Sequence, residues 1–254
     1  MITIASGTAQ NPAPDGLYQP GGVENGILQQ MEQSAERFAY SDAQALQFEI
    51  ALRAATVGHA VALNRSGMDF SVFRKTRCNP AYWERTPDGG FVLRASVSAA
   101  AAIRDIYQNG RQYATECATA MLIVFYGAVL SLYPDALFDR LFGSIRLMNW
   151  RYVPPVFAGV ARMSPARTFL PGDRQYFMNP DVNPLTPEWQ GENVILLDGG
   201  HYYGHGIGIG GAAEIIRALN ENRTQDAMQS AFLMDQAGRP DYHSLDHALR
   251  GGAR

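Results

Sequence analysis

The chain has 254 residues, of which 46% are hydrophobic and 18% charged. These fractions are ordinary for a globular protein and exclude wholesale disorder, and the length allows one large domain or two small ones. A formal net charge of −3 argues against nucleic acid as the main partner, because nucleic-acid binding needs a basic surface. Lys75 is the only lysine; every other basic residue is an arginine.

The two cysteines, Cys78 and Cys117, cannot form a disulfide framework, which is typical of a reducing compartment. The first residues show no basic flank followed by an apolar core, so no secretory signal is expected and synthesis is predicted to be cytoplasmic. The longest apolar stretch, residues 118–132, is too short to span a membrane and predicts a buried core helix.

The first half of the chain predicts helices. Residues 1–25 are rich in Gly, Pro, Asn and Gln without periodicity and predict an extended arm before a single domain, residues 26–254. Ser41 opens a capping box with the glutamine three residues on, so a helix is expected up to residue 66, closed by a left-handed Gly67. The segment from 116 to 132 is apolar nearly all round and should form a helix in the middle of the fold. The other helices expected here are residues 98–108 and 134–142.

The second half predicts strands. Gly199-Gly200 separates two apolar runs, Glu192–Asp198 and His201–Ile207, which is a strong hairpin signal. Helices followed by a mostly antiparallel sheet predict an α+β fold. The other elements expected are strands at residues 145–150, 175–179 and 228–234, a proline-containing loop at 151–168, and a helix at 212–222.

Cys117 stands at the predicted start of the central helix. Free backbone N–H groups and the positive end of the helix dipole favour a thiolate there, and the thiolate is the reactive form of a cysteine nucleophile. The alternative is a small apolar residue buried in a core helix. Cys78 follows a polar, basic segment and is expected to be structural or incidental.

Glu192 and His205 lie on the two strands of the predicted hairpin. A two-residue turn would pair Val194 with His205, which places Glu192 and His205 on one face as diagonal neighbours. A three-residue loop would break this parity. An acidic residue on an apolar strand needs a partner or a function, although a solvated glutamate at the strand end is the open alternative.

Glu116 directly precedes the cysteine. Its structural role would be to complement the helix dipole, and its chemical role would be that of a carboxylate within reach of the thiol. Two ionised carboxylates would raise the pKa of the thiol. If these glutamates act, one of them is expected to share the thiol proton, and the group would titrate as a coupled set.

Residues 206–211 fit G-x-G-x-x-G between a strand and a helix, as in a dinucleotide-binding motif. The preceding strand is half of a hairpin and too little chain follows for a nucleotide-binding sheet, so no such cofactor is expected. Two histidine pairs lack the glutamate of H-E-x-x-H, and no metal is expected. The pairs are His201 with His205 and His243 with His247.

Several long motifs occur in order along the chain. They are SGMDFSVFRKT, NPAYW, YATECATAMLIVFY, LPGDRQYFMNP and WQGENVILLDGGHYYGHGIGI. Together they resemble the spore-coat type of bacterial transglutaminase, the protein-glutamine gamma-glutamyltransferase of spore-forming bacteria, from about residue 25 nearly to the end. The chain departs from that pattern in a longer, Gln-rich N-terminal arm and a longer loop at 151–168.

The resemblance implies a papain-like fold and a calcium-independent reaction, without a cofactor, that joins a glutamine carboxamide to a lysine amine and releases ammonia. It implies Cys117 as the nucleophile, Glu192 as its partner and Glu116 as a second partner. Backbone N–H groups at the helix start are expected to hold the oxyanion. For His205, two roles stay open: orienting Glu192 or filling the sheet face. The aromatic residues expected to wall a tunnel over the cysteine are Phe70, Trp150 and Trp189.

The implied partners are proteins that carry glutamine and lysine, coat proteins among them, with a spore-coat location if the organism sporulates. Two alternatives stay open. One is a cysteine hydrolase on the same scaffold, either a deamidase or a cell-wall endopeptidase, which would release ammonia or peptide without incorporating an amine. The other is a non-catalytic coat protein that keeps the fold.

The single lysine generates a prediction. A lysine amine is the acceptor in this reaction, whereas the delocalised guanidinium of arginine stays protonated. With 14 glutamines and one lysine, the chain is a potential donor and a poor acceptor toward its own copies. When the protein is incubated alone, denaturing electrophoresis should show at most a covalent dimer formed through Lys75 or the N-terminal amine. Extended isopeptide ladders would contradict this expectation.

Overall fold

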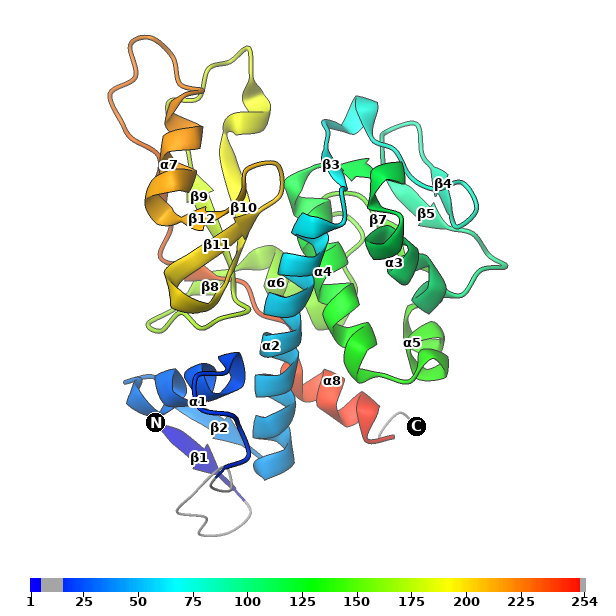
Figure 1. The fold of residues 1–254 in the computed structure, drawn as a ribbon, viewed down its shortest axis with the longest axis vertical. Helices are drawn as coiled ribbons and strands as arrows, with labels where there is room; N and C mark the ends of the chain where they lie inside the picture. Colours follow the sequence, from blue (N-terminus) through cyan, green and yellow to red (C-terminus); the bar gives the residue numbers. More distant parts are fainter. Residues whose placement is uncertain (6–15, 252–254) are drawn as a thin grey trace.

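The computed structural model describes residues 1–5 and 16–251, and its fold is the expected mixture of helices and a mostly antiparallel sheet. Figure 1 shows α2 running through the middle of the molecule, with the larger sheet on one side and α3, α4 and α5 on the other. The helices are α1 (Val23–Gln33), α2 (Ala43–Arg65), α3 (Ala99–Gln108), α4 (Cys117–Leu132), α5 (Asp135–Phe142), α6 (Ala158–Arg162), α7 (Ala212–Asn220) and α8 (Tyr242–Leu249).

The larger sheet is antiparallel, with the strand order β12-β11-β10-β9-β13. Its strands are β9 (Arg174–Met178), β10 (Gly191–Leu196), β11 (His201–Gly204), β12 (Gly208–Gly211) and β13 (Phe232–Leu233). The small sheets contain β1 (Ile2–Ile4) with β2 (Phe38–Tyr40), β3 (Asp69–Phe70) with β6 (Ala114–Thr115), β4 (Trp83–Arg85) with β5 (Phe91–Leu93) and β7 (Arg146–Leu147), and β8 (Ser164–Pro165) with β14 (Gln236–Ala237).

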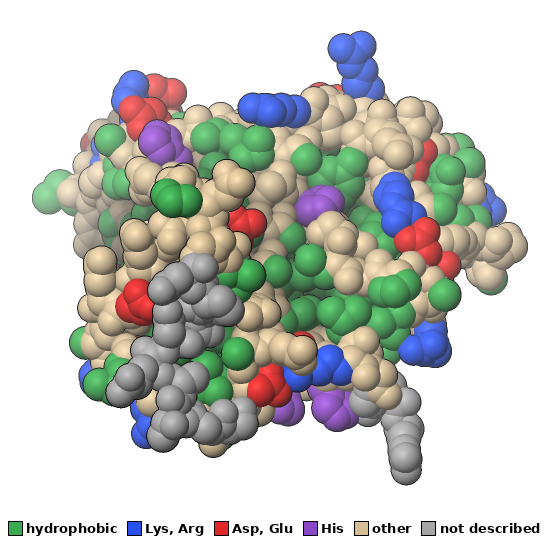
Figure 2. All heavy atoms as spheres, turned by 60° about the horizontal axis from the view of Figure 1, so that its bottom comes forward, with side chains coloured by type: hydrophobic (Ala, Val, Ile, Leu, Met, Phe, Trp, Pro, Cys, Tyr) green, Lys and Arg blue, Asp and Glu red, His purple; other side chains and the backbone are tan. Residues whose placement is uncertain are grey.

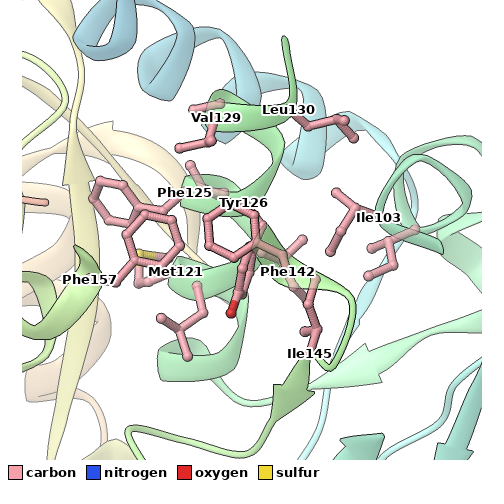
Figure 3. Packing of buried hydrophobic residues seen from close by; sticks show 14 of the residues in the cluster. Ile103, Met121, Phe125, Tyr126, Val129, Leu130, Phe142, Ile145 and Phe157 are labelled. Atoms are coloured by element: carbon pink, nitrogen blue, oxygen red, sulfur yellow. The ribbon is translucent and has the colours of Figure 1, made fainter. Parts of the chain in front are cut away.

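The helix α4 is the buried central helix that its composition predicts. It packs against both α2 and β10, and almost all of its side chains are buried. Figure 3 shows its apolar residues meeting those of neighbouring segments; the ring of Tyr126 meets Phe142 and Phe157 edge to face, with centroids 5.3 and 5.1 Å away. Each large side chain buried in this way stabilises the fold by about 1.5–3 kcal/mol. The core therefore fixes the helix that begins with Cys117.

The predicted ends of several helices are confirmed. Ser98 caps α3 by accepting a hydrogen bond from the N–H of Ala101 (3.1 Å), and Gly67 adopts the left-handed conformation after α2. The predicted cap of α2 is wrong by one residue. Asp42, not Ser41, accepts from the N–H of Ala45 (2.9 Å), because its carboxylate is an equally good cap that also complements the helix dipole.

Other expectations need correction. The helix α1 begins inside the predicted N-terminal arm, and β1 pairs with β2; residues 6–15 of that arm lie outside the described residues. In the predicted strand at 145–150, only Arg146 and Leu147 form a strand, and the predicted loop at 151–168 contains α6. The division into arm and domain stays a prediction.

The register of the β10–β11 hairpin differs from the predicted one by one residue. Val194 pairs with Gly204, which leaves the three residues Asp198–Gly200 in the loop. The side chain of Asp198 accepts a hydrogen bond from the N–H of Gly199 (2.9 Å), and both glycines have left-handed backbone angles. Asp198 therefore belongs to the turn rather than to the strand, and the parity on which the predicted face depended is broken.

The glycine-rich motif at 206–211 forms the turn into β12 and that strand itself, which is an antiparallel edge of the sheet rather than part of a parallel βαβ unit. None of the described helices is both long and apolar enough to span a membrane. On the face shown in Figure 2, acidic and basic side chains lie scattered and form no continuous basic surface among the described residues.

A buried ionic network ties the sheet to α2. The guanidinium of Arg53, on α2, contacts Asp173 (2.7 Å) and Glu49 (2.8 Å), and Asp173 also binds Arg239 (2.8 Å). The side chains of Arg53 and Asp173 are fully buried. Burial acts to raise the pKa of Asp173, but Arg53 and Arg239 outweigh it, and the pKa lies below its ordinary value. The ionised carboxylate therefore holds two arginines at the start of β9.

Replacing this carboxylate should destabilise the fold. Asp173→Asn leaves two guanidiniums facing each other, and loss of one buried partner costs about 3–5 kcal/mol. Because the folded-state pKa is depressed, the contribution of Asp173 is present above its unfolded pKa and is lost as pH falls through the folded value. Urea unfolding at neutral and acidic pH should show the variant losing most at neutral pH. The matched control Asp135→Asn, in an exposed pair with Arg104, should change little.

Candidate active site

Glu116 caps α4 at the point where Cys117 begins the helix. Its carboxylate accepts hydrogen bonds from the N–H groups of Ala118 (2.5 Å) and Thr119 (2.9 Å). This explains why a glutamate can be buried there, since a buried helix end must satisfy its free N–H groups. It also corrects one expectation: these two helix-start amides are occupied by Glu116 and are not free to hold an oxyanion.

Cys117 is partly exposed at the wall of a pocket of about 860 Å³. The pocket lies between the start of α4, the segment after β3, and the first residues of β9 and β10. Phe70 and Trp150 line it, together with Asn193, Arg174 and Tyr176. A pocket of this size can hold an extended side chain.

Trp189 stands apart from the other two aromatic residues. It lies in the short 3₁₀ turn Pro187–Trp189 and packs against the apolar cluster of Phe177 and Val194. The residues that line the pocket include Pro187 and Gln190 but not Trp189. Trp189 therefore lies against that cluster rather than on the pocket wall, and its role in a tunnel stays a prediction.

Glu192 is buried on β10 and shares a sheet face with Gly204. Its side chain fills the space above that glycine, because a Cβ at position 204 would come within 2.9 Å of Glu192 Cγ. Burial and the nearby charge of Glu116 raise the pKa of Glu192 well above its usual range, while the backbone N–H of His205 and the thiol of Cys117 act to lower it. Its Oε1 is buried without a hydrogen-bond partner among the described residues, so this oxygen can hold or accept a proton.

The thiol of Cys117 is disfavoured as a free thiolate. Burial raises its pKa, and the charges of Glu192 and Glu116 raise it further, whereas hydrogen bonds from Asn193 lower it. The arrangement matches the expectation of a coupled set in which thiol and carboxyl group compete for a proton. The thiol of Cys117 therefore holds its proton more tightly than a free cysteine does.

The imidazole of His205 does not bind Glu192 or Cys117. Its Nδ1 lies 2.9 Å from the hydroxyl of Tyr203 and its Nε2 lies 3.1 Å from the backbone oxygen of Asp69. Because a carbonyl oxygen only accepts, Nε2 carries the proton and Nδ1 accepts from the tyrosine. Burial lowers the pKa of His205 to about 4, so the ring is neutral. The ring ties β11 to β3, and only its backbone N–H faces Glu192.

Two polar residues that sequence reasoning missed complete the site. The side-chain Nδ2 of Asn193 lies 3.1 Å from the sulfur of Cys117, and its Oδ1 accepts from Nε of Arg174 (2.9 Å). Both residues are buried. The sequence did carry a signal for them, because a polar residue on a buried strand requires a partner. Which residues Arg174 and Asn193 pair with is visible only once β9 and β10 are paired.

Acyl transfer by a cysteine requires a nucleophile, a group to take its proton and a pocket that holds the carbonyl. The fold brings these three requirements together around Cys117. The site is therefore of the kind found in cysteine-dependent acyl-transfer enzymes. Among the described residues, no group of three or more His, Cys, Asp or Glu side chains is arranged to hold a metal ion.

Comparison with known proteins identifies the family. Residues 1–249 match the family model described as TGL, protein-glutamine gamma-glutamyltransferase. Curated proteins of that name from Bacillus cereus (strain 03BB102) and Bacillus anthracis (strain CDC 684 / NRRL 3495) are each 43% identical over 231 residues, covering 91% of this chain and 83% of theirs. The chain belongs to the protein-glutamine gamma-glutamyltransferase family, which confirms the resemblance.

A solved structure agrees with this assignment. The transglutaminase from Geobacillus stearothermophilus, without its C-terminal extension, superposes with a TM-score of 0.77 at 45% sequence identity. The match covers 82% of this chain and 98% of that one. The expected fold, in which the helix that begins with the cysteine packs on an antiparallel sheet, is confirmed.

The electrostatics of the site predict the pH dependence of Cys117 alkylation by iodoacetamide. Because burial and two carboxyl groups raise the pKa of the thiol, alkylation of the wild type should still be rising above the pKa of a free cysteine, about 8.5. Glu192→Gln removes one negative charge and should shift this profile to lower pH. The control Glu221→Gln, on the exposed end of α7, should leave it in place. A profile of Glu192→Gln that moves to higher pH would contradict this account.

Proposed function

We propose that this chain joins the side-chain carboxamide of a protein glutamine to a lysine amine through a thioester on Cys117, with Glu192 as the base. The proposal is supported above all by one observation: the Cys117 thiol lines the pocket while the buried Glu192 carboxyl group lies beside it. Membership of the family supports the reaction, and the geometry supports the roles of the two residues.

The proton has a complete path in this scheme. Glu192 takes the thiol proton as the sulfur attacks the glutamine carbonyl, and it passes that proton to the departing nitrogen, so the C–N bond breaks and ammonia leaves. The thioester remains on Cys117. Glu192 then takes a proton from the incoming lysine amine, whose nitrogen attacks the thioester, and the sulfur departs and is reprotonated.

A carboxyl group serves this cycle because its pKa is raised. An ordinary glutamate would be too weak a base to take a proton from a thiol at neutral pH, whereas a base with a pKa closer to the working pH is effective. Burial and Glu116 both raise the pKa of Glu192. We assign Glu116 two contributions: capping the helix that carries Cys117, and keeping Glu192 basic. Its role as a second proton acceptor follows the family resemblance.

The pocket walls favour an amine over water. Phe70 and Trp150 contribute apolar surface to the pocket that Cys117 also lines, and the alkyl part of a lysine side chain gains by burial there, whereas water does not. This preference separates a transferase from a hydrolase on the same scaffold. The expected substrates are proteins with accessible glutamine and lysine, and coat proteins with a spore-coat location are the finer form of this proposal.

Amine incorporation tests the proposal. The wild type should couple a labelled primary amine to a glutamine-bearing protein, and Cys117→Ala should abolish coupling. Glu192→Gln should lower it by about 100-fold or more, since positioned acid–base catalysis contributes on the order of 10²–10⁴, while Glu221→Gln serves as the control. Calcium independence predicts the same rate in the presence of a chelator.

The outcomes separate the alternatives. Full activity in Cys117→Ala would refute the assignment of the nucleophile. Release of ammonia from a glutamine peptide without any incorporation of amine would favour the hydrolase. A rate that falls when calcium is chelated, and returns when calcium is restored, would overturn calcium independence alone.

A further inference from the structure

The side chain of Asn193 is held in one orientation by its neighbour on β9. Arg174 donates to Asn193 Oδ1 from Nε (2.9 Å) and also from Nη2. A guanidinium has donors only, so the asparagine must turn its oxygen toward Arg174 and its NH₂ group toward Cys117. The contact between Nδ2 and the sulfur (3.1 Å) is therefore a directed donor, not an arbitrary choice between two amide orientations.

The guanidinium of Arg174 is held by several neighbours besides Asn193. Its Nη1 donates to the backbone oxygen of Val160 (2.9 Å), and its guanidinium lies 4.3 Å from the centre of the Trp150 ring. No carboxylate among the described residues forms an ion pair with it, in contrast to Arg53 and Arg239 in the same molecule. Burial lowers the pKa of Arg174 to about 10, which still leaves it charged at neutral pH. A buried positive charge without a counter-charge thus lies behind the Asn193 amide.

This amide lies where negative charge develops. When the sulfur attacks, the carbonyl π electrons move to oxygen while the S–C bond forms, and they return when the C–N bond breaks. The new oxyanion is on the carbon bonded to Sγ, so a donor 3.1 Å from Sγ is within reach of it. The second N–H of Asn193 has no acceptor among the described residues, and the residue lines the pocket. Because Glu116 occupies the N–H groups of Ala118 and Thr119, these two helix-start amides cannot serve as oxyanion donors, whereas the Asn193 amide can.

We propose that the side-chain amide of Asn193 is an oxyanion donor in the transglutaminase reaction and that Arg174 is the positioning residue that aims it. The inference rests on the proposed role of Cys117 as the nucleophile. It adds a residue to the reaction rather than altering the substrates, and it assigns a purpose to an arginine whose charge the rest of the fold leaves uncompensated.

Comparing two reactions of the same sulfur tests the role of Asn193. Acylation by a glutamine peptide builds an oxyanion, whereas alkylation by iodoacetamide displaces iodide at a saturated carbon and builds none. In Asn193→Ala, the single-turnover release of ammonia should fall by about 100-fold, the loss typical of one oxyanion donor, and alkylation should change only a few-fold. Asn64→Ala, an exposed asparagine on α2, is the control and should leave both rates unchanged.

Two results would overturn the proposal. Equal losses in acylation and alkylation would mean that Asn193 acts on the sulfur or on the fold, and acylation within about threefold of the wild type would mean that it contributes no donor. If Cys117→Ala is inactive while Asn193→Ala is unaffected, only this inference fails and the proposed nucleophile stands.

A double-mutant cycle tests Arg174. Arg174→Met should lower kcat with little change in KM, and Arg174→Lys should restore part of the loss, because an ammonium can still donate to Asn193 Oδ1. In the Asn193→Ala background, Arg174→Met should cost almost nothing more, since a positioning residue acts through its partner. An undiminished effect in that background would refute the positioning role. Thermal unfolding midpoints show whether each variant folds. If Arg174→Met does not fold, the comparison of acylation with alkylation in Asn193→Ala decides the proposal.

Discussion

The need to satisfy a buried helix end shapes the whole site. The helix α4 begins inside the protein, where its first N–H groups cannot reach bulk water, and Glu116 meets that need with both carboxylate oxygens. The cap has an electrostatic consequence, because it places a carboxylate beside Cys117. Burial raises the pKa of the thiol and of Glu192, and the charge of this carboxylate raises both further. Burial of this helix end and its cap thus both contribute to a Cys117 thiol that keeps its proton and to a Glu192 carboxyl group with a raised pKa.

The strand β9 connects this site to the framework. Asp173, just before the strand, is buried between Arg53 and Arg239, whereas the next residue, Arg174, points into the pocket and has no carboxylate partner among the described residues. Adjacent residues on a strand face opposite sides, so one side of this segment is neutralised for stability and the other keeps its charge. The fold tolerates the second arginine because backbone oxygens, Asn193 and the Trp150 ring surround it.

Local patterns predicted those parts of the fold that depend on local chemistry. The apolar run of α4 and the serine before α3 act within a few residues, and the ends of both helices were predicted to within one residue. The hairpin was found, but its register was wrong because Asp198 binds the N–H of Gly199 and joins the turn. The three-residue turn therefore decided which residues Glu192 faces, and periodicity carries no information about turn length.

The site shows the same division between local and tertiary causes. Cys117 and Glu116 were singled out from the start of one helix, whereas Asn193 and Arg174 acquire meaning only through the pairing of β9 with β10. Trp189 was expected in the tunnel from resemblance alone, and in the structure it packs against the apolar cluster of Phe177 and Val194. Side chains whose partners lie far along the chain look like ordinary strand residues until the sheet is assembled.

The positive charge beside the pocket belongs to Arg174, which bonds to the side-chain amide of Asn193 and not to a carboxylate. A carboxylate beside Arg174 would neutralise it and add a third negative group near Cys117, which would make the thiolate still less accessible. Asn193, which lies between Arg174 and Cys117, accepts from the guanidinium and donates to the sulfur, and it adds no charge of its own. The guanidinium can then remain uncompensated in the resting enzyme and hold the Asn193 amide with its NH₂ group toward the sulfur. An arrangement of this kind costs the fold a buried cation without a carboxylate partner and gives the transition state a preorganised amide donor.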